Sequence, residues 1–372
     1  MMAKLGEVCK VSPSTKNIER QGAWLLNLDM VEQQTGRVIE YKYVGEDDLN
    51  GSIIQFDTEN VLYSKLRPNL NKVVLPPKDG FSTSELLPLR PDASVLNKDY
   101  LAAFLRSDSF VTWAVSKTAG AKMPRLGTKD LMNAEIPVPS IEQQKKIAEK
   151  FKKLEQLISL RKQQLAKLDE LVKARFVEMF LLHDYPTKTL DELSIGKGEY
   201  GAQSASTEYD STRPRYIRIT DVNEDGTLND DKVSSENITD DEQYRLSYGD
   251  FMFARMGATV GKTYAFLSGN QIFAGYLIRY KLNLSLTNPR YLFWYTKLDD
   301  YQKWVKLNQS GAAQPGINAK KYGSLKIPVP PIALQNQFAA FVERVDQQKQ
   351  TVQQSLEKLE LMKKALMQEY FG

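Results

Sequence analysis

The hexapeptide Ile136-Pro137-Val138-Pro139-Ser140-Ile141 returns later in the chain as Ile327-Pro328-Val329-Pro330-Pro331-Ile332. The offset is 191, the difference between 327 and 136. Proline cannot donate a backbone hydrogen bond and restricts the residue before it, so each copy must be extended. Each copy is followed by a glutamine-rich stretch with the spacing of a helix. Two such junctions in one chain indicate an internal duplication.

The duplication extends in both directions from this hexapeptide. With the same offset, the matched positions downstream and just upstream are Tyr100/Tyr291, Gly120/Gly311, Pro124/Pro315, Gln144/Gln335, Leu165/Leu356, Leu168/Leu359 and Phe180/Phe371. Further upstream the offset drifts, and Val61 to Lys65 aligns with Phe251 to Arg255. The tails agree closely and the globular parts only loosely. Similar tails joined to divergent globular parts predict that the two globular parts recognise two different targets.

The two tails are predicted to be long helices that pair as an antiparallel coiled coil. Apolar residues recur in steps of three and four, the pattern of a coiled-coil seam. In the first tail they are Ile147, Phe151, Leu154, Ile158, Leu165, Leu168, Val172 and Met179, with Arg161 and Arg175 as interruptions. In the second they are Phe338, Val342, Val345, Val352, Leu356, Leu359, Leu366 and Tyr370, with Lys349 and Lys363 as interruptions. A single rod would expose its seam, so pairing of the two is favoured over two separate surface helices.

The globular parts are predicted to be mixed α/β. Tyr216 to Ile219 and Phe251 to Ala254 have the alternation of strands. Asn288 precedes a helix that has Pro289 at its first position, and Asn97 begins the equivalent helix in the first half. The predicted fold is therefore mixed α+β: two globular domains joined by two long antiparallel coiled-coil helices, related by a pseudo-two-fold repeat.

Composition excludes several functional classes. The chain has one cysteine, Cys9, and one histidine, His183. An intrachain disulfide is therefore impossible, and a metal site built from thiols or imidazoles, or a catalytic triad, is nearly excluded. No apolar run is long enough to span a membrane, and residues 1–7 lack the pattern of a signal peptide, so we expect a cytoplasmic protein. The net charge of +4 is too small to establish nucleic-acid binding by itself.

Two motifs resemble catalytic signatures and fail in detail. Gly257 to Thr263 is similar to a phosphate-binding loop, but three residues separate its glycines where four are required, so a turn between strands is favoured. Asn288-Pro289-Arg290-Tyr291 is similar to the Asn-Pro-Pro-Tyr of amino-group methyltransferases but lacks the second proline, so a helix cap is favoured. Carboxylates are abundant, which leaves a metal-dependent nuclease as an open alternative.

Polar and basic residues in the loops of both halves are the candidate DNA contacts. Arginine and lysine hold phosphates, arginine can bond guanine with two hydrogen bonds, and glutamine or asparagine can do so with adenine. The candidates are Lys65, Arg67, Asn69, Lys72, Lys117, Lys122, Arg125, Arg213, Arg215, Arg218, Arg255, Thr259, Lys262, Gln309 and Gln314. Lys72 and Lys262 are expected to hold phosphates, and Arg215, Arg255 and Gln314 to reach base edges. The acidic stretch from Asp221 to Glu242 is expected to face away from phosphates or toward a basic protein.

The whole chain resembles the specificity (S) subunit of Type I restriction–modification systems. The resemblance rests on the duplicated Ile-Pro-Val-Pro-x-Ile, on Arg255 to Lys262, and on Gly311 to Ile317 before the second tail. In the first half, Lys65 to Asn69 replaces the Arg-x-Gly turn, so the first turn departs from the pattern. The resemblance implies a non-catalytic subunit with target recognition domains at 1–140 and 182–331 and conserved helices at 141–181 and 332–372.

The same resemblance implies partners. These are double-stranded DNA read as an asymmetric bipartite site, two adenine methyltransferase (M) subunits that carry S-adenosylmethionine, and restriction (R) subunits. The chain itself is expected to bind no cofactor, no metal and no membrane. A coiled-coil scaffold that binds only proteins remains an alternative, as does the nuclease.

Overall fold

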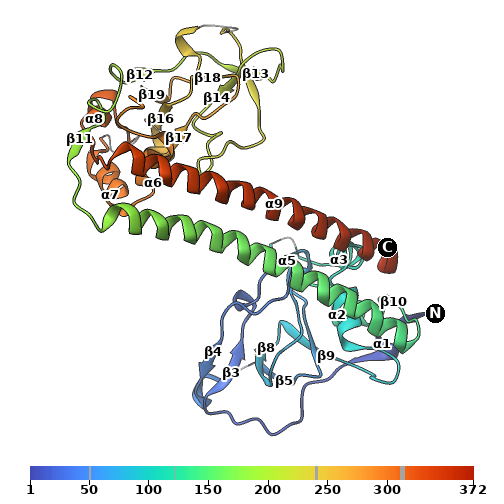
Figure 1. Ribbon diagram of the computed structural model, residues 1–372. Helices are drawn as coiled ribbons and strands as arrows, with labels where there is room; N and C mark the ends of the chain where they lie inside the picture. The colour runs from blue at the N-terminus through green and yellow to red at the C-terminus, as the bar shows by residue number, and fades with distance from the viewer. Residues whose placement is uncertain (50–51, 121, 239–241, 311–314) are drawn as a thin grey trace. The chain divides into compact units, whose positions relative to one another are not determined.

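A computed structural model describes residues 1–49, 52–120, 122–238, 242–310 and 315–372 (Figure 1). The chain divides into two compact units, residues 1–163 with 353–372 and residues 164–352. Each unit therefore holds one globular part, the beginning of one long helix and the end of the other. The predicted boundaries of the recognition domains divide the chain by its sequence repeat and not into these compact units, and they stay predictions.

The first unit contains two four-stranded sheets and a short pair of strands. The pair is β1 (Met2–Lys4) with β10 (Glu135–Pro137). One sheet has the order β2 (Cys9–Val11), β9 (Leu86–Pro91), β6 (Val61–Ser64), β7 (Val73–Val74). The other has the order β4 (Lys42–Val44), β3 (Ala23–Leu26), β8 (Gly80–Thr83), β5 (Ile53–Phe56). The helices are α1 (Leu5–Val8), α2 (Lys98–Leu105), α3 (Asp108–Ser116) and α4 (Thr128–Met132), with 3-10 turns at Leu28–Met30, Glu46–Leu49 and Pro68–Leu70.

The second unit repeats this frame. Its short pair is β11 (Thr187–Thr189) with β20 (Lys326–Pro328), and its four-stranded sheet has the order β12 (Glu199–Tyr200), β19 (Leu277–Lys281), β16 (Asp250–Ala254), β17 (Thr263–Ala265). Two smaller pairs are β13 (Ser206–Glu208) with β15 (Val233–Ser235) and, in parallel, β14 (Arg215–Ile217) with β18 (Gln271–Phe273). The helices are α6 (Pro289–Tyr295), α7 (Asp299–Asn308) and α8 (Ala319–Gly323), with 3-10 turns at Glu242–Tyr244 and Gly257–Thr259.

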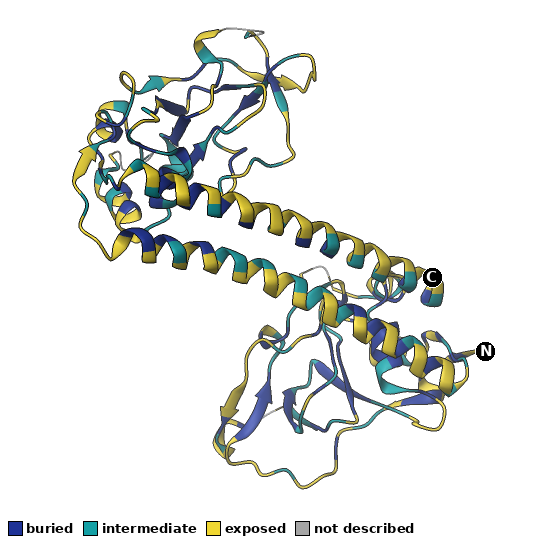
Figure 2. Ribbon diagram, in the orientation of Figure 1, coloured by how far each residue is buried: buried dark blue, intermediate teal, exposed yellow. Residues whose placement is uncertain are grey.

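The long helices begin where the sequence predicts. α5 (Ile141–Phe176) and α9 (Ile332–Phe371) start directly after the two Pro-Val-Pro stretches, and α5 continues into a π-helical turn, Val177–Leu181. All sixteen predicted seam positions are buried or half-buried. In Figure 2 much of both helices is exposed, with buried and half-buried residues recurring along them.

Within each unit the two helices run antiparallel. In the first unit the ring of Phe151 lies 5.8 Å from that of Phe371, while Lys162 of α5 pairs with Glu360, which precedes Phe371 in α9, at 3.2 Å. In the second unit, Asp169 pairs with Lys349 at 2.7 Å, and the ring of Phe176 lies 5.3 Å from that of Phe338. Residue numbers rise along α5 as they fall along α9, which confirms the antiparallel prediction.

The lysines that interrupt the second seam are satisfied by acids across the helix pair. Lys349 bonds Asp169, and Lys363 bonds Glu155 at 2.9 Å. Both lysines are half-buried. A charge in an apolar seam is tolerated when a partner reaches it, so these breaks in the pattern do not break the pairing.

A buried glutamine joins each long helix to its globular part. Gln144 and Gln335 are both fully buried. The Gln144 side chain accepts from the Asn97 backbone N–H at 2.8 Å and donates to the carbonyls of Val95 and Pro139, both at 2.9 Å. Gln335 makes the same three contacts, with Asn288 at 2.9 Å, Leu286 at 3.0 Å and Pro330 at 2.8 Å.

Those contacts also position the predicted Asn-capped helices. The Asn97 side chain accepts from two backbone N–H groups at the start of α2, and that of Asn288 accepts from the Arg290 N–H in α6. Both helix caps are confirmed, and the second one replaces the methyltransferase interpretation of Asn288 to Tyr291.

Candidate nucleic-acid interface

The first unit builds its candidate site from two loops. The Pro68–Leu70 turn follows strand β6, and residues 117–126 lead from α3 to α4. The Arg67 N–H donates to the Pro124 carbonyl at 2.8 Å, and the Leu126 N–H donates to the Lys65 carbonyl at 2.9 Å. These backbone bonds bring the candidates of both loops onto one surface.

The second unit holds its equivalent turn in the same way. The Gly257 N–H donates to the Pro315 carbonyl at 3.0 Å, and the Ile317 N–H donates to the Arg255 carbonyl at 2.9 Å. Gly257–Thr259 is a 3-10 turn between strands, as predicted, and not a phosphate-binding loop. Thus Arg255 stands in the place of Lys65, and Gly257 in the place of Arg67.

Several cations of the first site are free of carboxylate partners. Arg67, Lys117 and Lys122 are exposed, Lys65 is half-buried, and none of the four forms an ion pair within the described chain. Arg125 is also exposed and pairs with Glu85 at 3.2 Å. Asn69 is exposed beside them. An excess of unpaired positive charge on one loop surface suits a polyanion.

Both predicted phosphate-binding lysines have partners inside the protein. The Lys72 ammonium donates to the Leu28 carbonyl at 2.5 Å, and partial burial lowers its pKa. Lys262 is half-buried and pairs with Glu224 at 2.8 Å. Phosphate contact by these two residues stays a prediction, but it would require each lysine to give up an internal partner.

The three arginines of strand β14 and its flanks are also held internally. Arg213 donates to the Ser235 and Ile238 carbonyls, and Arg215 donates to the Asn229 carbonyl at 2.7 Å. Arg218 pairs with Asp221 at 2.7 Å and Asp231 at 2.8 Å, and the hydrogen bonds that it donates to Asp221 raise its pKa. The acidic stretch thus neutralises this arginine, and DNA contact by all three stays a prediction.

Arg255 is the candidate of the second unit that lies on an aromatic ring. Its guanidinium carbon is 4.8 Å from the centre of the Tyr200 ring, which is partly exposed. Such a contact fixes the guanidinium plane without neutralising its charge. Thr259 bonds back to the Met256 carbonyl at 3.3 Å, Gln309 is half-buried after α7, and Gln314 lies outside the described residues.

The structure adds two kinds of candidate residue that sequence reasoning missed. Gln34 is exposed and donates to the Asn69 carbonyl at 3.1 Å, although 35 residues separate them. Tyr41, just before strand β4, and Tyr43 on that strand are exposed, and the Lys78 ammonium lies 5.1 and 4.2 Å from their ring centres. The alternation of Tyr41 and Tyr43 around Lys42 was a usable signal for the strand, whereas nothing local links Gln34 to the turn.

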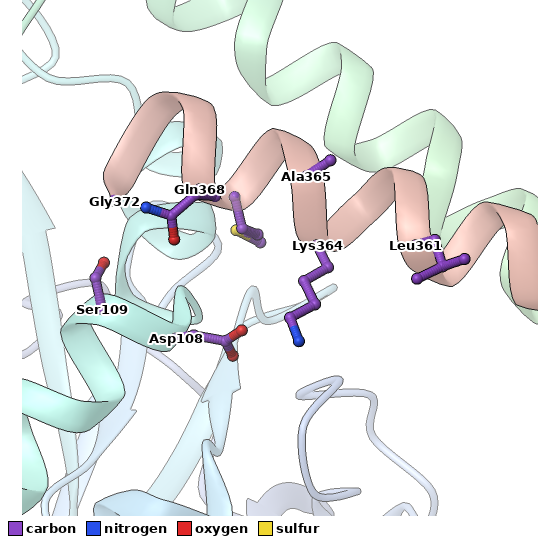
Figure 3. Close-up of a pocket in the computed structure, with 8 residues that line it drawn as sticks. Asp108, Ser109, Leu361, Lys364, Ala365, Gln368 and Gly372 are labelled. Carbon is purple, nitrogen blue, oxygen red and sulfur yellow. The ribbon is translucent and has the colours of Figure 1, made fainter.

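The described chain contains shallow hollows on its surface. One of about 310 Å³ lies in the first unit between α3 and the end of α9 (Figure 3). Its charged side chains are Asp108 and Lys364. Among the described residues, no group of three or more His, Cys, Asp or Glu could hold a metal ion. Burial raises the pKa of Cys9 to about 12, so its thiol is a poor nucleophile.

None of the helices in the described ranges is both long enough and apolar enough to cross a membrane.

Comparison with known families gives two matches to one model. The Type I restriction modification DNA specificity domain matches residues 1–170 and again residues 183–361. The match falls once in each copy of the duplication.

Two curated relatives agree with this match. The specificity subunit of the Type I restriction enzyme EcoDI from Escherichia coli is 27% identical over 124 residues, which cover 33% of this chain and 27% of that subunit. The specificity subunit of the Type I restriction enzyme MjaVIII from Methanocaldococcus jannaschii is 21% identical over 313 residues, which cover 78% of this chain and 73% of that subunit. The first alignment thus spans only about a quarter of the E. coli subunit.

Solved structures share the fold over the full length. The crystal structure of the Type I restriction–modification system S subunit from M. genitalium has a TM-score of 0.63 at 16% identity, covering 100% of this chain and 96% of that one. A chain from work on complex assembly and conformational transition of the type I R-M system has a TM-score of 0.60 at 18% identity, covering 100% and 97%. Both confirm the predicted fold.

Proposed function

The chain belongs to the Type I restriction modification DNA specificity family, and we propose that it is the subunit that reads the DNA target of such a system. It recognises an asymmetric site in two parts, with one globular part for each half-site. The chain itself catalyses neither methylation nor cleavage.

One observation carries this proposal: the family model matches once in each copy of the duplication. The two copies hold the same turn with the same backbone bonds, yet they present Lys65 and Arg67 in one and Arg255 and Gly257 in the other. A shared frame with different side chains at its tip supports two different half-sites, because base edges are distinguished by the groups that face them.

The long helices have two roles in this proposal. They set the length of the unread spacer between the half-sites, and they dock two methyltransferase subunits, which bind S-adenosylmethionine and modify adenine. Restriction subunits join that complex. We place the assembly in the cytoplasm, where its DNA target lies.

The comparisons do not favour the alternatives, a protein-only scaffold or a metal-dependent nuclease. All three are separated by a gel shift of the full chain with its methyltransferase subunits on a mixed library of DNA duplexes. The experiment uses a series of salt concentrations, with and without a divalent metal.

The proposed function predicts binding that weakens with salt, selection of a two-part sequence and no cleavage by the chain alone. Cleavage by the chain with metal would replace this proposal by the nuclease. Failure to bind any duplex in the presence of methyltransferase subunits would replace it by the scaffold.

A further inference from the structure

The residues other than glycine that have a left-handed backbone gather at one place in the described chain. Among the described residues, three that are not glycine have a positive φ: Gln34 at 64°, Arg67 at 49° and Asn71 at 50°. Arg67 and Asn71 flank the Pro68–Leu70 turn, and Gln34 lies against it, because its N–H donates to the Leu70 carbonyl at 3.1 Å. Side chains disfavour this conformation, and residues held in it cluster where a fold positions a ligand.

The second unit has the same turn geometry, with glycines at the positions that have a positive φ. The Ser64 N–H donates to the Lys72 carbonyl in the first unit, and the Ala254 N–H donates to the Lys262 carbonyl in the second. This register makes Gly257 the counterpart of Arg67 and Gly261 the counterpart of Asn71. Both glycines also have positive φ, 73° and 87°, which glycine adopts freely. The first unit keeps two side chains where glycine would be easier.

The side chain of Asn71 has an internal role, whereas that of Arg67 does not. Asn71 is buried, and its amide donates to the Arg106 carbonyl at 3.0 Å. Arg67 is exposed, and its one internal side-chain bond in the described chain is a long one, 3.5 Å, to the Lys122 carbonyl. Backbone bonds hold Arg67 in this conformation, but its side chain adds only that long bond among the described residues.

We propose that Arg67 is a base-reading residue of the first recognition domain, held by the strained turn so that its guanidinium bonds a guanine edge in the major groove. Gln34 is exposed against the same turn, where its side-chain nitrogen bonds the Asn69 carbonyl and its side-chain oxygen is available for a neighbouring base. This inference rests on the proposed function, since it requires that the first domain binds duplex DNA. Arginine gives the commonest specific contact to guanine because its two donors match two acceptors.

The charges around Arg67 suit this role. Lys65 and Lys122 come from the two loops that hold the turn, and within the described ranges Glu85, which pairs with Arg125, is the one carboxylate in an ion pair with this group of cations. The surrounding cations supply attraction to phosphates that does not depend on sequence. Arg67 then supplies the part that does.

The test compares Arg67→Gly, Arg67→Lys and the control Lys117→Ala. Each full chain is assembled with methyltransferase subunits and incubated with a library of randomised duplexes, and the bound fraction is sequenced. Exchange of residues 182–331 for another recognition domain shows which half-site belongs to the second domain, and the other half-site is then the first domain's.

Arg67→Gly should leave the melting temperature unchanged or raise it, because glycine accepts this φ. It should reduce discrimination at one base pair of the first half-site roughly 5- to 150-fold, the range for one bidentate contact. Arg67→Lys should keep the salt dependence and lose part of the same discrimination, because an ammonium lacks the two fixed donors of a guanidinium. Lys117→Ala should weaken binding to all sequences equally.

Two results would overturn the inference while leaving the proposed function intact. One is unchanged preference in the first half-site for both Arg67 variants. The other is equal weakening on all sequences with a lower salt slope, which would make Arg67 a phosphate contact. If the unaltered chain selects no two-part sequence, the proposed function itself fails.

Discussion

Replacing Gln144 by leucine should loosen the first unit while the second unit stays intact. Leucine is close to glutamine in volume but makes none of its three hydrogen bonds. The Asn97 N–H and the carbonyls of Val95 and Pro139 would be left without the partner that they have now. The site is fully buried, so water does not readily replace the amide.

The magnitude follows from those three groups. A buried polar group without a partner costs about 1 to 3 kcal/mol, so three cost about 3 to 9 kcal/mol. The greater apolarity of leucine offsets up to about 2 kcal/mol. The net loss is therefore about 1 to 7 kcal/mol, and a loss of about 3 kcal/mol corresponds to a roughly hundredfold larger population of the open form of the unit.

Hydrogen exchange followed by mass spectrometry on the full chain measures this by region. In Gln144→Leu, peptides from α2 and from β10 should exchange roughly a hundredfold faster, while those from α6 and β20 should not change. Gln335→Leu should show the reverse. Gln163→Leu, an exposed change on the same helix, is the control. A change below threefold, or an equal change in both units, would refute the proposed role of these glutamines.

Three further predictions concern the helices and one buried acid. Leu356→Glu should lower the melting temperature by several degrees, since it places a charge in the buried seam. Leu361→Glu, on the exposed face of the same helix, should not lower it. Equal melting temperatures for the two variants would contradict the assignment of the seam. Burial alone would raise the pKa of Asp57, but its bonds to Arg90 and Ser14 outweigh this and lower it to about 2. Because the pKa of Asp57 is lowered, its carboxylate stabilises the fold at pH values above the ordinary pKa near 3.8, and this contribution is lost as the pH falls toward 2. In urea unfolding, Asp57→Asn should therefore be less stable than the unaltered chain by about 2 kcal/mol at pH 5 and nearly as stable at pH 2. A difference in stability that does not depend on pH would contradict this. One heptad inserted after Leu165 and another after Leu356 should lengthen each helix by about 10 Å and lengthen the preferred spacer without changing the bases read in a binding selection; altered half-sites would count against that division of roles.

The arrangement of long helices and globular parts was predictable because the sequence contains an internal duplication. The Pro-Val-Pro stretches cannot be helical, and the glutamines that follow them recur at a fixed offset. Seam periodicity, two helix caps and the antiparallel pairing all followed from such local or repeated signals. These three features depend on backbone hydrogen bonding and on burial of apolar side chains, and the order of residue types in the sequence indicates both.

The roles of the basic residues were much harder to predict, because charge alone does not reveal a partner. Arg218 has Asp221 three residues away, and this pairing had a local signal. Arg213 bonds backbone carbonyls more than 20 residues away, and no side-chain pattern marks such a contact. The turn at Arg67 was marked as a departure from the family pattern, but only its backbone angle shows that an arginine occupies a position suited to glycine.

Each long helix ends against the globular part of the other copy. The ring of Phe371, at the end of α9, lies 5.3 Å from that of Tyr100, and the ring of Phe180, just after α5, lies 4.9 Å from that of Tyr291. Both tyrosines also donate to the carbonyl of the first proline in a Pro-Val-Pro stretch, at 2.8 and 2.9 Å. The helix ends therefore meet the same surface in both units.

This equivalence explains how recognition can change while the frame stays the same. Each helix end packs on the tyrosine of a capped helix, which in turn bonds a Pro-Val-Pro stretch, whereas the turns at Arg67 and Gly257 lie on other segments of the chain. Substitutions at the turns leave the tyrosine, the buried glutamine and the seam unchanged. A foreign globular part that keeps an asparagine cap, the tyrosine three residues after it and the Pro-Val-Pro stretch should consequently dock on the same helix ends, whatever side chains its turn presents.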